Sequence, residues 1–283
     1  MTPSLTPTAR RQRLGAELRK LRERAGLTAT QAAALLGGNQ ARISNIEAGR
    51  YGVSAERVRA LTCHYDCADT ELVDALAAMT GDRKRGWWEE YREILSNGLL
   101  DLAELEHHGR RLRTAHTSGI PGLLQTLDHA REIMRQVVPA LPPSDVEHRI
   151  SFRIKRQAVL DREDAAPYQA VIHEAALRMR FGGRSVAGRQ LQHLLDAGQR
   201  DHITIRVIPF AAGAFPGSGQ PLYYVHGPVP QLDTVQLDQA HGPVLLDAEA
   251  QLHKYRQVFA RLESLALGAT ESADFIHNIA KDL

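Results

Sequence analysis

The segment LTATQAAALLGGNQARISNIE, residues 27–47, has the spacing of two short helices joined by a turn. Ala33 is a small residue at the point where the helices would cross, and Gly37 follows four positions later at the turn. Ile43 and Ile46 then lie about one helical turn apart. Because this combination lets two helices approach and pack closely, the segment predicts a helix-turn-helix.

The residues that begin each helix agree with this prediction. Thr28 is followed three positions later by Gln31, which is the pattern of a capping box for the first helix of the pair. Asn39 stands where the second helix would begin and is a favourable N-cap residue.

The outer face of the second helix is short, polar and free of acidic residues. Glutamine and asparagine amides can pair with the adenine edge in the major groove, serine can serve several bases, and arginine can reach guanine or phosphate. We therefore predict a DNA recognition helix. The alternative is an ordinary solvated helix pair within a helical domain. With Ile43 and Ile46 pointing inward, this face consists of Gln40, Ala41, Ser44 and Asn45, with Arg42 at its flank.

Positive charge is concentrated around the same segment. Residues 1–65 contain eleven Lys/Arg and four Asp/Glu, a net charge of +7, whereas the whole chain is +2 and residues 66–283 are therefore −5. Phosphate contacts supply affinity but no direct sequence information. We expect Arg42 and Arg50 to contact DNA and one arginine of the first helix to pair with Glu47. The predicted DNA-binding residues are Thr28, Asn39, Gln40, Ala41, Arg42, Ser44, Asn45 and Arg50.

The 283-residue chain is long enough for two domains, and the charge difference favours two. It has no apolar run of about 18 residues that would span a membrane, and its first residues lack the apolar segment of a secretory signal. We expect a cytoplasmic, nucleoid-associated protein. Cys63 and Cys67 fit a reducing compartment. No second ligand pair follows them, so we expect buried thiols, and no metal or cofactor.

The predicted fold is an all-α N-terminal domain followed by an α+β regulatory domain with a small sheet. Residues 1–9 are expected to be a mobile tail, and residues 10–66 a helix-turn-helix domain of four or five helices. The first helix should run over residues 10–25 and end at Gly26. The regulatory domain, residues 67–283, should be helical over 67–162 and α+β over 163–283.

Periodicity predicts the elements of the second domain. The best linker candidate is the polar segment 81–86. Strands are expected over 168–172, 203–208, 222–225 and 234–237. Helices are expected over 69–79, 87–105, 122–138, 145–161, 184–197, 244–267 and 272–279.

The helix-turn-helix segment also resembles a known family. With Leu18-Arg19-Lys20-Leu21-Arg22 before it and Glu47-Ala48-Gly49-Arg50 after it, the segment is similar to XRE-type regulators of bacteria and phages over roughly residues 12–66. Ala29 stands where that family usually has glutamine, so the contact normally made from that position is not expected here. Gln31 is instead assigned to the capping box.

Three later motifs resemble the C-terminal domain of WhiJ-like actinobacterial regulators. The resemblance implies a transcription factor that is often encoded beside a small partner protein and is linked to development or antibiotic production. Such pairs are sometimes described as toxin–antitoxin-like. The motifs are Ile120-Pro121-Gly122-Leu123-Leu124-Gln125-Thr126, then Arg149 with Arg153-x-x-Arg156-Gln157, then Val207-Ile208-Pro209-Phe210 before a Gly/Pro-rich stretch.

Three roles are open for residues 67–283: a platform for a small protein partner, a sensor of small molecules, or, more remotely, an enzyme. No dinucleotide-binding, phosphate-loop or nucleophile-elbow motif is present. His173-Glu174 begins like a zinc-protease helix, but Leu177 replaces the second histidine. We therefore expect no enzymatic activity and no catalytic residues. Trp87, Trp88 and Phe215 could line a pocket for a ligand or partner, or they could be core anchors and a simple connection.

The prediction for the whole chain is a sequence-specific DNA-binding transcriptional regulator, acting as a repressor. One recognition helix reads only a few base pairs. Two of them, about one DNA turn apart, are needed on a near-palindromic double-stranded operator, so we expect a homodimer. The C-terminal domain would control it through a small protein partner, with a small-molecule sensor or an antitoxin-like component as the alternatives.

Overall fold

The computed structural model describes residues 7–80, 86–217, 220–239 and 242–283. The chain divides into two compact units, Met1–Glu90 with Leu99–Leu105, and Tyr91–Gly98 with Glu106–Leu283. Residues 1–6 of the predicted tail and 81–85 of the predicted linker lie outside the described residues. Within the tail, the Thr8 side chain accepts a hydrogen bond from the Arg11 amide at 3.3 Å and so caps the first helix.

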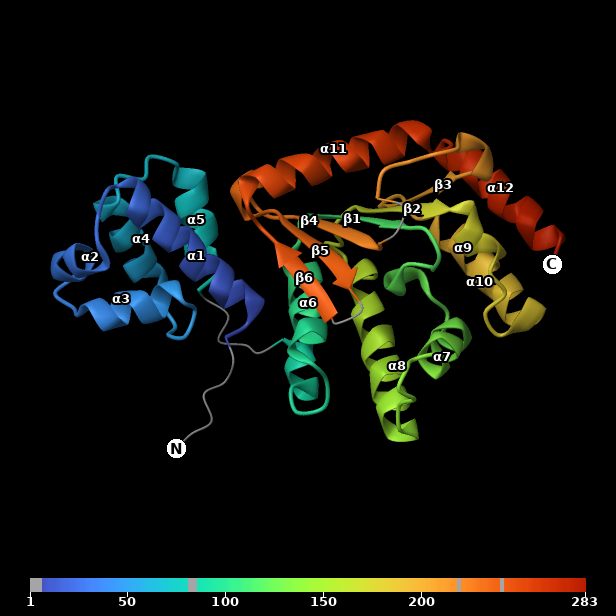
Figure 1. Cartoon of the computed structure of the whole chain (residues 1–283), viewed down its shortest axis with the longest axis horizontal. Helices are drawn as coiled ribbons and strands as arrows, with labels where there is room; N and C mark the ends of the chain where they lie inside the picture. The colour runs from blue at the N-terminus through green and yellow to red at the C-terminus, as the bar shows by residue number, and fades with distance from the viewer. Residues whose placement is uncertain (1–6, 81–85, 218–219, 240–241) are drawn as a thin grey trace. The chain divides into compact units, whose positions relative to one another are not determined.

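The first unit is helical, as predicted. A buried face of α1 carries Leu14, Leu18 and Leu21, which form its core with Val58 and Leu61 of α4. The last helix, α5, lies beyond the boundary predicted at residue 66 and packs against α4. In the described part of this unit the α-helices before residue 80 are α1 (Ala9–Arg24), α2 (Ala29–Leu35), α3 (Gln40–Glu47), α4 (Ala55–His64) and α5 (Thr70–Ala78) (Figure 1).

The second unit is built on a mixed sheet with the strand order β3-β2-β1-β4-β5-β6. Neighbouring strands are parallel from β3 to β1, and antiparallel from β1 through β4 and β5 to β6. The α+β fold class is therefore confirmed. The strands are β1 (Arg111–His116), β2 (Tyr168–His173), β3 (Ile203–Ile208), β4 (Leu222–His226), β5 (Thr234–Gln239) and β6 (Gly242–Leu246).

Helices cover both faces of this sheet. On one face, Leu252 and Phe259 of α11 (Glu249–Leu265) pack against Leu222, Tyr224 and Val235. Figure 1 shows α7 (Leu127–Arg135) and α8 (Pro143–Gln157) on the opposite side of the sheet from α11. The remaining elements of the unit are α6 (Asn97–His108, shared with the first unit), α9 (Glu174–Arg178), α10 (Gly183–Ala197), α12 (Ala269–Lys281) and the 3-10 turns η2 (Gly122–Leu124), η3 (Ala158–Leu160), η4 (Phe210–Ala212) and η5 (Pro230–Leu232).

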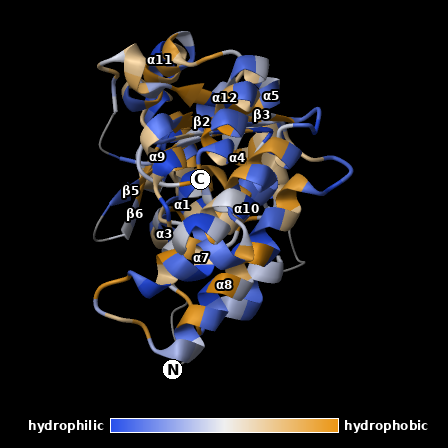
Figure 2. Ribbon diagram, turned by 90° about the vertical axis from the view of Figure 1, so that its right-hand side faces the viewer, coloured by the Kyte–Doolittle hydropathy of each residue, from blue (hydrophilic) through white to orange (hydrophobic). Residues whose placement is uncertain are grey.

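The helices α7, α8 and α10 are amphipathic. In Figure 2 their ribbons alternate between hydrophilic and hydrophobic residues along the chain. α7 packs against both α8 and α10, so their apolar sides are buried within the unit. No helix in the described ranges is long and apolar enough to cross a membrane.

Three predicted elements need correction. Residues 87–105 form a short 3-10 helix, η1 (Trp87–Tyr91), and then part of α6, rather than one helix. Residues 122–138 contain η2 and then α7, which begins after Thr126 because this side chain accepts from the His129 amide at 3.3 Å. Val244 belongs to β6, and the helix predicted from that position begins at Glu249.

Strand β1 lies within the segment that was predicted to be helical. Its arginines hide the strand pattern, because charged side chains are unusual in the middle of a sheet. Arg113 is nevertheless buried. Its guanidinium lies 4.4 Å from the centre of the Phe259 ring and 2.9 Å from a Glu263 carboxylate oxygen. The ion pair and the ring contact therefore hold the charged end of this side chain on the face covered by α11, although its Nε has no hydrogen-bond partner.

Candidate nucleic-acid interface

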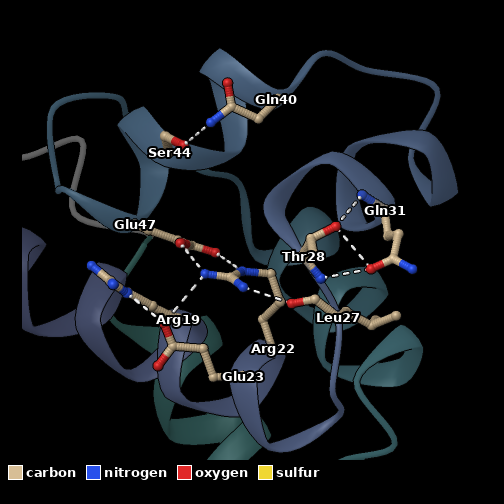
Figure 3. Close-up of polar contacts among 9 residues, drawn as sticks. All are labelled: Arg19, Arg22, Glu23, Leu27, Thr28, Gln31, Gln40, Ser44 and Glu47. Carbon is tan, nitrogen blue, oxygen red and sulfur yellow. Dashed lines mark hydrogen bonds and ion pairs between the residues drawn. The ribbon is translucent and has the colours of Figure 1, made fainter.

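The two helices of the helix-turn-helix begin at the predicted caps. The Thr28 amide donates to Gln31 Oε1 at 2.8 Å, and the Gln31 amide donates to Thr28 Oγ1 at 3.2 Å (Figure 3). This is the reciprocal capping box of α2. Asn39 Oδ1 accepts from the Arg42 amide at 2.8 Å and caps α3. Both predictions are confirmed.

A buried ion pair holds α1 to α3. Arg22 Nε and Nη2 donate to the two carboxylate oxygens of Glu47 at 2.6 and 2.9 Å, and Nη1 donates to the Leu27 carbonyl at 2.7 Å (Figure 3). The Arg22 and Glu47 side chains are only 9% and 8% exposed. The hydrogen bond to Glu47 raises the pKa of Arg22 above its ordinary value. Arg22 is therefore the arginine of the first helix that was predicted to pair with Glu47.

Two glycines bring the backbones of α1 and α3 into direct contact. A Cβ atom on Gly15 would lie closer than 3.0 Å to the carbonyl oxygens of both Ile46 and Glu47. Gly49 has a φ of +69°, and a Cβ there would lie 2.8 Å from the Gln12 amide nitrogen. The family motif includes Gly49, but the close approach at either glycine was not predicted. The one available signal for Gly15 was a glycine inside a helix, where it is unfavourable without a packing reason.

The outer face of α3 is presented to solvent. Ile43 and Ile46 are each 3% exposed and face the core. Gln40, Ala41 and Arg42 are exposed on the other side. The solvent-facing side of α3 is therefore polar and has no acidic residue, and the opposite side is packed into the core.

Two pairs of predicted DNA-binding side chains lie together. Gln40 Nε2 donates to Ser44 Oγ at 2.8 Å (Figure 3). Arg50 Nη1 donates to Asn45 Oδ1 at 3.4 Å, and the Arg50 amide donates to the Asn45 carbonyl at 2.9 Å. Ser44 and Asn45 are half-buried, whereas Arg50 is exposed.

Thr28 and Asn39 are the N-cap residues of α2 and α3 and take no part in these two pairs. Both are exposed, and their side chains accept from backbone amides in the first turns of α2 and α3. Each therefore stands at a helix N-terminus, which favours negatively charged groups such as phosphate.

The aromatic residues considered for a pocket belong to two different units. Trp88 is 4% exposed and packs edge-on against Trp87, with ring centres 6.0 Å apart, and both belong to the first unit. Phe215 belongs to the second unit, where its ring centre lies 5.0 Å from that of His173. Trp88 is a core side chain, and Phe215 packs on the buried cluster that contains Ile208.

The cysteines correct one prediction. Cys63 is exposed and Cys67 is half-buried, and both are free thiols. Cys63 lies on the solvent side of α4, whose buried residues are Val58, Leu61 and Thr62. The predicted burial of both thiols is therefore wrong. Among the described residues, no three His, Cys, Asp or Glu side chains form a group that could hold a metal ion.

Comparison with known proteins assigns both parts of the chain. A family model described as a helix-turn-helix domain matches residues 13–76, which supports a DNA-binding regulator of transcription. No curated protein and no solved structure matches the chain. A second family model, described as a domain of unknown function (DUF5753), matches residues 99–278. The chain therefore belongs to the DUF5753 family and carries a helix-turn-helix domain in front of the family domain.

Proposed function

We propose that the chain is a sequence-specific transcriptional regulator whose helix α3 enters the major groove of DNA. The observation that carries this proposal is the exposed, acid-free face of α3, fixed from behind by the buried Arg22–Glu47 pair. A rigid helix can hold its side chains at the distances that base recognition requires. The helix-turn-helix domain at residues 13–76 supports the same role.

Within this interface, Gln40, Ser44 and Asn45 are proposed to read base edges, and Arg42 and Arg50 to contact phosphates or guanine. Ala41 would contact a thymine methyl group, since it is exposed between them. Thr28 and Asn39 would bring the amides of the helix N-termini to backbone phosphates. The +7 charge of residues 1–65 supplies the general attraction to DNA.

We further propose that the protein binds a near-palindromic operator as a homodimer and represses transcription by occupying it. Residues 67–283 would control the DNA-bound state through a small protein partner, in the manner implied by the resemblance to WhiJ-like regulators, including their toxin–antitoxin-like pairs. We assign no enzymatic reaction to this region. Small-molecule sensing is the second candidate, and a group of arginines in the second unit supports it.

The test of base reading begins with selection of a preferred operator from random DNA. Gln40→Ala should weaken operator binding by about 1–3 kcal/mol and leave binding to random DNA nearly unchanged. Arg50→Ala should weaken both and lower the salt slope by about one unit. Gln136→Ala, at an exposed glutamine of the second unit, serves as the control and should bind like the wild type.

Two outcomes would contradict the proposal. An equal loss on operator and random DNA for Gln40→Ala would remove that residue from base reading. A selected site with a single half-site, rather than two inverted half-sites about one DNA turn apart, would contradict the dimer.

A further inference from the structure

A group of arginines in the second unit has more positive charge than its acidic neighbours balance. Arg149, Arg153 and Arg156 follow one another on α8 at spacings of four and three, which places them on one side of the helix. Arg156 Nε lies 2.7 Å from a carboxylate oxygen of the buried Glu106. In the described part of the chain Arg153 forms no ion pair, and its Nη1 donates instead to the neutral Gln125 Oε1 at 2.5 Å.

The environment of Arg153 disfavours its charge. The side chain is half-buried, and burial lowers the pKa of Arg153 to about 10, with repulsion from Arg156 acting in the same direction. Guanidinium groups are normally buried with a carboxylate or phosphate that accepts their fork of N–H donors. The charges of Asp238 and Glu106 act in the opposite direction, but neither carboxylate forms an ion pair with Arg153 in the described part of the chain.

The two guanidinium groups converge over the backbone of Gly122. A Cβ atom built on this glycine would lie 3.0 Å from Arg156 Nη2 and 4.0 Å from Arg153 Nε. The backbone is held in place because Gln157 Nε2 donates to the carbonyls of Gly122 and Gln125 at 3.0 and 2.7 Å. The two guanidinium groups therefore hold their positions before any ligand binds. They can lie this close to the backbone because Gly122 has no side chain.

Two buried polar groups without hydrogen-bond partners feel the charge of these arginines. His129 is 2% exposed, and neither of its ring nitrogens has a hydrogen-bond partner in the described structure. Burial, together with the charge of Arg153, lowers the pKa of His129 to about 4. Tyr168 is 1% exposed, and its unpartnered hydroxyl feels the charges of Glu106 and Arg156. Such groups are rare in native proteins unless they serve a function.

We propose that Arg153 and Arg156, above Gly122, bind the carboxylate or phosphate group of an anionic small molecule. The anion would accept from the guanidinium donors that no protein carboxylate occupies and would offset the repulsion between the two arginines. We propose a small molecule as the ligand because Arg153 is half-buried and Arg156 is buried, near the C-terminal end of α8. This site lies in the second unit and does not depend on the proposed reading of DNA.

The test uses the full chain without DNA. Its thermal unfolding is followed in inorganic phosphate and, separately, in succinate, with the ionic strength held constant by sodium chloride. The wild type should be stabilised in a saturable manner by at least one of these anions. Arg153→Gln should weaken the apparent affinity by about tenfold or more, because it removes charge-assisted hydrogen bonds. Arg135→Gln, at an exposed arginine paired with Glu132, should respond like the wild type.

The comparison between variants is decisive because phosphate also stabilises proteins by exclusion from their surface. Hydrogen exchange should show protection of residues 120–126 and 149–157 by the anion in the wild type only. A response to phosphate alone would identify a phosphoryl ligand, and a response to succinate alone would identify a carboxylate. No saturable response to either anion would overturn the proposal.

A second variant guards against loss of fold. Gly122→Ala keeps both charges but fills the point where they converge, and it should lose the anion response while its circular dichroism stays unchanged. In sodium chloride alone, Arg153→Gln should be at least as stable as the wild type, because it removes an unpaired charge. If folded Arg153→Gln and Gly122→Ala proteins both respond to the anions like the wild type, the site is not where we place it.

Discussion

Arg22 in the first unit and Arg153 in the second both project from a helix into the protein, but their partners differ. Arg22 meets both oxygens of Glu47 and the Leu27 carbonyl, so each part of its guanidinium has an acceptor. Arg153 meets one neutral amide oxygen and faces a second arginine. The matched arginine fixes two helices to each other, whereas the unmatched one is the arginine that we propose to bind an anion.

The largest effect should come from breaking the matched pair. Glu47→Ala leaves Arg22 buried without its carboxylate, and it should destabilise the first unit by about 3–5 kcal/mol. Urea unfolding followed by tryptophan fluorescence measures this unit alone, because both tryptophans of the chain, Trp87 and Trp88, belong to it.

The control is the exposed pair on the same helix. Arg19 and Glu23 are 2.7 Å apart, with side chains 62% and 52% exposed, so Arg19→Ala should leave the urea midpoint unchanged. A midpoint for Glu47→Ala equal to that of Arg19→Ala would mean that the buried pair does not hold the unit together.

The second effect is a pH dependence of the stability of the second unit, caused by His129, which feels the charge of Arg153. Because the pKa of His129 is lowered to about 4 in the folded state, the unfolded chain binds its proton first as the pH falls. The stability that comes from the neutral histidine is complete above pH about 6.5 and is lost as the pH falls toward about 4, by roughly 3 kcal/mol in all. Hydrogen exchange in the strands of the second unit should follow this loss.

His129→Phe tests the assignment, since its ring can keep the edge-on contact with Phe181. The variant should lose less stability than the wild type over the same pH range. The difference between the two proteins is the quantity to measure, because two other groups titrate over the same range. Burial lowers the pKa of His116 to about 4, which also costs stability as the pH falls, and raises that of Glu106 to about 6, which favours the folded state at the lower pH. Parallel pH curves for the two proteins would exclude His129 as the source.

The smallest effect should come from displacing the matched pair without removing a charge. Gly15→Ala places a methyl group against the Glu47 carbonyl and must shift α1 or α3, at about 1–3 kcal/mol. Gly38→Ala is the matched control, because the nearest atoms to its Cβ are 3.8 Å away. Equal tryptophan-monitored urea midpoints for the two variants would show that the backbone contact at Gly15 is not needed.

Local signals made the first unit predictable from sequence. The caps at Thr28 and Asn39 are contacts between residues three positions apart. The sequence spacing that predicts such a cap is therefore also the spacing of the contact. The strands β2 and β3 were predicted because buried parallel strands consist largely of apolar and β-branched residues. The partner of Glu47 was predicted only as an arginine of the first helix, since several arginines stand there.

Long-range contacts account for what the sequence did not reveal. Gly15 matters because of Ile46 and Glu47, and Arg113 can lie in β1 because of Phe259 and Glu263. The same holds for Arg153. Its motif was visible in the sequence, but the lack of an acidic partner is a property of the folded unit and cannot be read from neighbours along the chain.

The position of β1 in the sheet has a consequence for synthesis on the ribosome. Its two neighbours, β2 and β4, are made only after residues 168 and 222. Helices α1–α5, by contrast, are complete at Ala78, and domains generally fold as they emerge. A message that ends between codons 117 and 167 would therefore encode the helix-turn-helix joined to a strand with two open edges. Such open edges promote aggregation. Truncated chains of this length should consequently be removed by cellular quality control before they compete with the complete protein.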